Sequence, residues 1–267
     1  MATVYVSGGG SALINAMRSC ADGDVLLVAD GDYSTGVVNN GSVRKRFTIR
    51  SVNGPENCIV RCTFYTSASD REIGDITVYG VTFVNALSMY NAHAALFYAL
   101  YGCIWRNFST PYHCCGVNMT ANTCLFINNT ATTDRLVGSN CTFTNCTFAS
   151  NTIAGGRIRY DKTDVFRNCL FAGNVNGSGD LLTNYTQNSS WPECPNCMAG
   201  AADLVDSDWR PVAGSTAYGG GSSTYLQTAT DLVGVTWRDP PAIGCYEFVA
   251  PSTGMPTLPT RMRPFGI

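Results

Sequence analysis

The sequence predicts an all-β protein that folds as a single right-handed parallel β-helix, with coils of about 22 residues and a short capping α-helix at the N-terminus. Five segments align at spacings of 21 to 23 residues. Within each segment, an apolar residue and an aromatic residue lie two positions apart. Charged residues make up only 13% of the chain, which suits stacked strands and tight turns rather than a helical bundle with charged outer faces.

The aligned segments place two rows of side chains in the core. A period near 22 residues is too short for two packed helices but suits a coil of three short strands. Residues two apart share a strand face, and equivalent residues of stacked coils lie about 4.8 Å apart. A β-sandwich would also alternate, but it would not keep this phase over successive intervals. The predicted inward ladder comprises Val81, Cys103, Cys124, Cys146, Cys169, Phe83, Trp105, Phe126, Phe148 and Phe171.

Small polar residues flank the ladder segments where turns are expected. The Gly or Asn before the first ladder residue, as at Gly102 and Asn145, marks a bend that can require a positive φ. Three coils carry an asparagine after the aromatic residue, at Asn129, Asn151 and Asn174. Amide side chains at such positions can hydrogen-bond along the helix axis. The turns are therefore predicted to reinforce the stack.

Four regions are predicted along the chain. They are an N-terminal strand with a cap helix (1–23), the β-helix (24–190), a closing segment (191–248) and an extended Pro-rich tail (249–267). In the first region, Leu13 and Met17 share a helical face, and Ser11 is the expected N-cap. Such a helix can cover the open end of the first coil, which would otherwise invite edge-to-edge aggregation.

The cysteines are predicted to be free thiols. Thirteen is an odd number, so the cysteines cannot all pair within the chain. Several fall at one phase of the repeat, which indicates a buried thiol stack and folding in a reducing compartment. The pair Cys194 and Cys197 has the spacing of half a zinc site, but no second such pair exists. We expect no metal and no cofactor.

Motifs near both ends of the chain carry a family resemblance. They are Thr3–Ser7, Gly23-Asp-Val-Leu-Leu-Val-Ala-Asp-Gly-Asp-Tyr33, Trp209–Ser215, Asp231–Gly234 and Ala242-Ile-Gly-Cys-Tyr-Glu-Phe248. Together they resemble the opening and closing segments of the pectate-lyase-like β-helix superfamily, which includes phage tailspikes and bacterial surface proteins. Thr216, Ala242 and Cys245 depart from its usual Pro, Asp and Ala. The resemblance implies the fold, whereas function depends on the site.

Catalytic chemistry has few candidate residues. A lyase of this fold would need calcium-binding carboxylates and an Arg or Lys base, and a hydrolase would need acids about 5–10 Å apart. The repeats are poor in acids, and the candidates are Asp134, Arg135, Arg157 and Asp161. Ca²⁺ is expected only if the protein is a lyase. The competing interpretation of these four residues is that they are solvated turn charges.

Ligand binding is predicted at turn aromatics. Tyr90, Tyr98 and Tyr112 could stack on sugar rings, although ordinary turn packing competes with this interpretation. The chain has 17 basic residues, and no basic run is interleaved with aromatics. We therefore expect no nucleic-acid partner. No apolar run reaches the length of a membrane span, so membrane insertion is not expected.

The leading functional hypothesis is a non-enzymatic bacteriophage virion protein, made in the host cytoplasm. It would be a tailspike-like or fibre component or a capsid decoration protein, with host polysaccharide as a further ligand. The grounds are the lack of a secretory signal, the low charge and the absence of clustered acids. We expect a homotrimer, with residues 251–267 as a docking arm for partner chains. The alternatives are a secreted polysaccharide-active enzyme and a bacterial surface adhesin.

Overall fold

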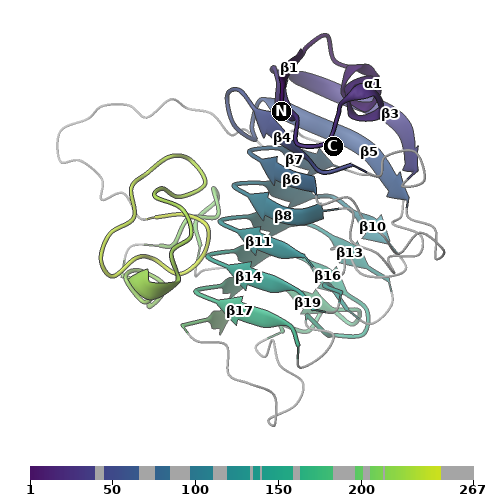
Figure 1. The fold of residues 1–267 in the computed structure, drawn as a ribbon. Coiled ribbons are helices and arrows are strands. Elements are labelled where there is room, and N and C mark those ends of the chain that lie inside the picture. The colour runs from purple at the N-terminus through teal and green to yellow at the C-terminus, as the bar shows by residue number, and fades with distance from the viewer. Residues whose placement is uncertain are drawn as a thin grey trace.

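The computed structural model is a right-handed parallel β-helix built from three sheets, which confirms the predicted fold class (Figure 1). All strand pairings within these sheets are parallel. Helical structure among the described residues is limited to one α-helix and one 3-10 helix. The structure describes residues 1–39, 45–65, 76–84, 97–110, 119–132, 135–138, 140–158, 163–182, 196–200, 205–212 and 214–247.

The three sheets run along the axis of the β-helix. Sheet A contains β1 (Thr3–Val6), β2 (Val25–Val28), β4 (Phe47–Ser51), β6 (Ile76–Tyr79), β8 (Phe97–Tyr101), β11 (Thr120–Asn122), β14 (Thr142–Thr144) and β17 (Val165–Arg167). Sheet B contains β3 (Gly31–Asn39), β5 (Cys58–Tyr65), β7 (Thr82–Val84), β9 (Ile104–Arg106), β12 (Leu125–Ile127), β15 (Thr147–Ala149), β18 (Leu170–Ala172) and β20 (Met198–Gly200). Sheet C contains β10 (Ser109–Thr110), β13 (Thr130–Ala131), β16 (Thr152–Ile153) and β19 (Val175–Asn176).

The register between coils reproduces the sequence period. Thr120 of β11 pairs with Ala99 of β8 on one side and with Thr142 of β14 on the other. Thr142 in turn pairs with Val165 of β17. Equivalent residues therefore follow one another at the same 21- to 23-residue spacing as the aligned segments, because each segment forms one coil.

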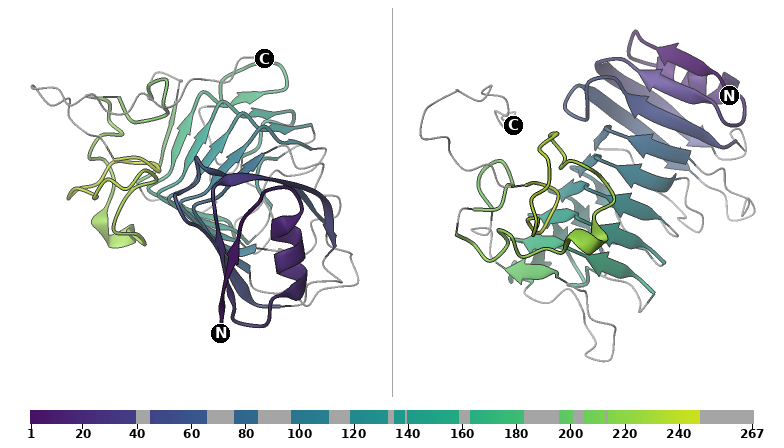
Figure 2. Two further views of the ribbon diagram at one scale, coloured as in Figure 1. Left: turned by 90° about the horizontal axis from the view of Figure 1, so that it is seen from above. Right: turned by 60° about the vertical axis from the view of Figure 1, so that its left-hand side comes forward.

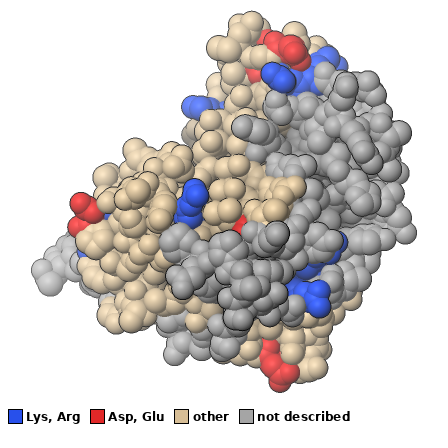
Figure 3. Space-filling model, turned by 60° about the horizontal axis from the view of Figure 1, so that its bottom comes forward, with Lys and Arg blue, Asp and Glu red and all other residues tan. Residues whose placement is uncertain are grey.

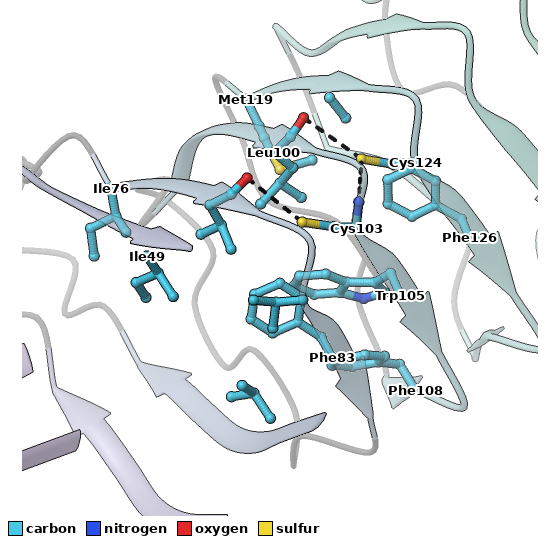
Figure 4. Close-up of a cluster of buried hydrophobic side chains, with 14 of the residues drawn as sticks. Ile49, Ile76, Phe83, Leu100, Cys103, Trp105, Phe108, Met119, Cys124 and Phe126 are labelled. Atoms are coloured by element: carbon cyan, nitrogen blue, oxygen red, sulfur yellow. Dashed lines mark hydrogen bonds between the residues drawn. The ribbon is translucent and has the colours of Figure 1, made fainter. Parts of the chain in front are cut away.

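The core contains the ten residues of the predicted ladder, all of them buried. Figure 4 shows the upper part of the ladder, with Phe83, Trp105 and Phe126 beside the Cys103 and Cys124 thiols. The rings of Phe126 and Phe148 stack with centroids 4.7 Å apart, and Phe171 continues the stack 5.1 Å from Phe148. Sheet A adds a second aromatic row, which the alignment did not identify. In it, Phe143 and Phe166 stack at 5.0 Å and meet the first row edge-on. Aromatic pairs in these geometries stabilise the core beyond their buried area.

The ladder cysteines form a continuous row of free thiols. The Cys124 thiol donates to the backbone carbonyls of Asn122, at 3.2 Å, and Leu100, at 3.6 Å, and the other three thiols make equivalent contacts. Half-buried Cys197 extends the row, because its Sγ accepts the Cys169 N–H at 3.3 Å. None of the nine cysteines whose side chains the structure describes forms a disulfide bond. The row therefore places a weak donor against backbone carbonyls in each of the four coils that carry a ladder cysteine.

The protein is expected to lose stability at alkaline pH. Burial raises the pKa of the Cys58 thiol to about 12 from its ordinary value of 9.0. Below pH 9 this thiol is protonated in both states. Between about pH 9 and 12 only the unfolded chain releases the proton, so this group alone lowers the free energy of unfolding by about 1.4 kcal/mol per pH unit. Urea unfolding between pH 8 and 10.5 measures this effect. The free energy of unfolding should fall less steeply with pH in Cys58→Ser than in the wild type, and equal pH dependence would contradict the raised pKa of Cys58.

Positive φ angles occur at the predicted bend before each ladder segment. They are Gly80 (63°), Gly102 (58°), Thr123 (54°), Asn145 (51°) and Asn168 (50°). Thr123 is unexpected, since β-branched residues rarely adopt this conformation. Its Oγ1 lies 2.9 Å from Thr228 Oγ1, a contact that helps to hold this turn.

The predicted asparagine ladder is present between sheets B and C. The Asn151 Oδ1 accepts the backbone N–H of Asn129 at 2.9 Å, and the Asn174 Oδ1 accepts that of Asn151 at 3.0 Å. Each Asn Nδ2 also donates to a carbonyl of the preceding coil. All three side chains are fully buried, so these bonds are shielded from water.

The first coil is covered by α1 (Ala12–Ser19), which buries Leu13, Ile14 and Met17 (Figure 2). The expected side-chain cap at Ser11 is absent, because Ser11 itself has a helical conformation with φ of −79° and ψ of 0°. At the other end, the Lys45 ammonium donates to the carbonyls of Arg18 and Cys20. A cation there complements the negative end of the helix dipole.

Candidate ligand-binding face

The structure brings together two of the four candidate catalytic residues. Arg135 and Arg157 pair across an isolated parallel bridge between adjacent coils. The other two, Asp134 and Asp161, lie outside the described residues. Within the part of the chain that the structure describes, no group of three or more His, Cys, Asp or Glu side chains is placed to hold a metal ion.

The side chains of the three candidate sugar-stacking tyrosines lie outside the part of the chain that the structure describes. Tyr90 and Tyr112 lie outside the described residues, and of Tyr98, in β8, only the backbone is described. In the described ranges, no helix is long and apolar enough to cross a membrane. Figure 3 brings the lower end of the molecule forward and shows charged side chains scattered over an otherwise uncharged described surface.

The outer face of sheet A carries one row of side chains along the whole β-helix, which we call the lateral row. Its residues pair coil by coil in strict register, because each strand contributes one outward residue at this position. The row consists of Tyr5, Leu27, Arg50, Tyr79, Tyr101, Asn122, Thr144 and Arg167.

The upper half of the lateral row is open to solvent. Tyr5 is 63% exposed, Arg50 is exposed, and Tyr79 and Tyr101 are half-buried. The two rings of Tyr79 and Tyr101 stack with centroids 4.8 Å apart and 11° between their planes. Arg50 lies on β4, on the opposite side of β6 from Tyr101, and its guanidinium carbon is 4.5 Å from the centroid of the Tyr79 ring. Because both faces of the Tyr79 ring are occupied, a ligand would contact its edge and its hydroxyl.

The lower half of the lateral row is closed. Asn122 and Thr144 are buried although they point outward from sheet A. Beside them, the Arg167 guanidinium lies 5.4 Å from the ring of Tyr225, in the 3-10 helix η3 (Ser223–Tyr225) of the closing segment. Next to this row, Asn168 forms two hydrogen bonds with the backbone of Ser222, at 2.9 and 3.0 Å. The closing segment thus borders the lateral row along its lower coils (Figures 1 and 2).

The closing segment also covers the outer face of sheet B. Leu232 and Tyr246 pack with Leu125 and Ile127, and Ile243 packs with Leu170. The Cys245 N–H donates to the Thr147 hydroxyl at 3.0 Å, and the Gly244 N–H to the carbonyl of Asn168 at 2.9 Å. The lower coils of sheet B are therefore an internal interface. By contrast, the upper half of sheet A is open to solvent.

Two buried carboxylates in the closing segment have structural partners. Asp231 accepts the backbone N–H groups of Val233, Val235 and Glu247. Glu247 accepts those of Arg238 and Ala242, both at 3.1 Å. Burial raises the pKa of Asp231, and the three N–H donors oppose that shift. Since both carboxylates hold the closing segment together, neither is positioned as a free acid or base.

No family model, curated protein or solved structure matches this chain. The candidate site therefore rests on geometry alone. Sequence reasoning chose tyrosines in the turns and missed Tyr79 and Tyr101, which lie in strands. A signal was available, because both directly precede the bend glycines Gly80 and Gly102 at the repeat spacing. A residue at this position of the repeat points outward from its strand, just before the bend.

Proposed function

We propose that this protein is a non-enzymatic, glycan-binding structural protein of a bacteriophage virion surface. The observation that carries the glycan-binding part is the open upper half of the lateral row, with Arg50, Tyr79 and Tyr101 held in one stack. Phenol hydroxyls and a guanidinium are donors suited to the hydroxyl and ring oxygens of sugars. Donors that repeat at the coil spacing of about 4.8 Å suit an extended polymer better than a compact ligand.

The virion assignment is supported by the low charge of the chain and by its continuous buried ladder. The non-enzymatic part is supported by the buried carboxylates Asp231 and Glu247, which accept hydrogen bonds from backbone N–H groups. We further propose that the chain assembles as a homotrimer with other virion proteins. In that assembly, residues 251–267, which lie outside the described residues, act as a docking arm.

The test is a binding screen of the full chain against bacterial surface polysaccharides. For the polysaccharide that binds most tightly, Tyr79→Ala and Tyr101→Ala are each expected to weaken the affinity about tenfold. Each variant removes a hydrogen-bonding hydroxyl and the ring against which the other tyrosine stacks. Isothermal titration calorimetry gives the dissociation constants.

Tyr218→Ala is the matched control, because Tyr218 is an exposed tyrosine that also lies near an arginine, Arg238, but outside the lateral row. It should bind as the wild type does. If Tyr79→Ala and Tyr101→Ala also bind as tightly as the wild type, the lateral row is not the binding face. Depolymerisation of the bound glycan would contradict the non-enzymatic assignment, and absence of the chain from purified phage particles would contradict the virion assignment.

A further inference from the structure

Arg106 is the one charged residue in a long uncharged stretch. Between Asp75 and Asp134 the sequence contains no other Asp, Glu, Lys or Arg. Arg106 ends β9 on the outer face of sheet B, where Val84 of β7 and Ile127 of β12 are its paired neighbours. Both neighbours are buried and apolar. A cation therefore lies between two apolar side chains in this row.

The Arg106 Nε has no hydrogen-bond acceptor in the described part of the chain. The residue is half-buried, and its Nε is buried without a hydrogen-bond partner. Native proteins rarely leave such a donor unpaired, because a charged group withdrawn from water without a partner is costly. The described residues therefore leave this nitrogen available for an acceptor from a ligand.

A second arginine lies close enough to affect the first. Arg61 of β5 follows Val60, which pairs with Phe83, so Arg61 continues the outer row that contains Val84 and Arg106. Burial lowers the pKa of Arg106, and the charge of Arg61 lowers it further. Arg61 is itself exposed and paired with Asp32 at 2.7 Å. An anion at Arg106 would relieve both the desolvation and the repulsion.

We propose that Arg106, assisted by Arg61, binds an oxyanion group of a ligand, a carboxylate or a sulfate, on the outer face of sheet B. A guanidinium presents a planar fork of donors that matches such groups. Ile127 belongs to the apolar cluster that Leu232 and Tyr246 of the closing segment complete. This apolar wall limits water around the guanidinium and strengthens its attraction for an anion. The site is separate from the lateral row, which lies on sheet A.

Calorimetric titration and thermal unfolding of the full chain at low ionic strength test this site. The probes are inorganic sulfate and sodium glucuronate, with glucose as the neutral control. At least one anion should bind and raise the Tm of the wild type, whereas glucose should not. A response to sulfate alone assigns the site to sulfate groups, and a response to glucuronate assigns it to carboxylates.

Arg106→Gln should weaken anion binding about tenfold or more and should raise the Tm in anion-free buffer, because it removes an unpaired charge. Arg61→Gln should weaken binding less, and it keeps the test valid if the first variant misfolds. Arg18→Gln, which removes an exposed charge on α1, should bind as the wild type does. The proposal is overturned if neither anion binds the wild type, or if loss of the Arg106 guanidinium leaves the affinity unchanged.

Discussion

Replacing Asn151 with alanine is expected to lower the free energy of unfolding by about 3 kcal/mol or more. Asn151 is the central rung of the asparagine ladder, and its amide bonds both neighbouring rungs. Without it, the backbone N–H of Asn129 loses its acceptor in a fully buried turn, and Asn174 loses a donor. Each unpaired buried group costs about 1–3 kcal/mol, and the smaller side chain adds a void.

Urea denaturation measures the loss, and amide hydrogen exchange should show faster exchange at Asn129. Asn15→Ala is the matched control, since Asn15 is exposed on α1 and its replacement should change stability by no more than about 0.5 kcal/mol. A loss below about 1 kcal/mol at Asn151 would mean that the ladder amides contribute little to holding the coils together.

Gly244→Ala is expected to detach the closing segment from sheet B and to cost about 3 kcal/mol. Gly244 has a φ of +105°, and a Cβ there would lie 2.5 Å from the Thr147 Oγ1 and 3.2 Å from the Leu170 Cβ. The backbone must move away, which breaks the Gly244 and Cys245 hydrogen bonds to the coil. Overpacking costs about 1–3 kcal/mol, and the left-handed backbone adds about 1–2 kcal/mol.

Gly234→Ala separates these two costs. Gly234 also lies in the closing segment and has a φ of +91°, but a Cβ there would meet nothing within 4 Å. This variant should therefore lose only the conformational part, about 1–2 kcal/mol. Limited proteolysis should cut the closing segment faster in Gly244→Ala than in Gly234→Ala. Equal cleavage and equal Tm values would show that close packing at Gly244 does not fasten the segment.

The coil follows from the periodicity of the sequence. Cys and aromatic residues two apart fix which strand face turns inward, and a constant spacing brings equivalent residues into register. The bend residues and the asparagine ladder were also predictable, since each belongs to the same repeat. These features follow from local periodicity, because each coil contacts mainly its neighbours.

Which faces of the β-helix are open depends on long-range packing. Thr147 and Cys245 are 98 positions apart, and no spacing rule predicts their hydrogen bond. That contact depends on the complementary shapes of a turn-rich segment and a sheet face, which periodicity does not encode. The same packing leaves Tyr79 and Tyr101 in the open half of sheet A and sets Arg106 beside an apolar wall. The candidate sites therefore arise from how the closing segment lies against the coils, whereas the coils arise from the repeat.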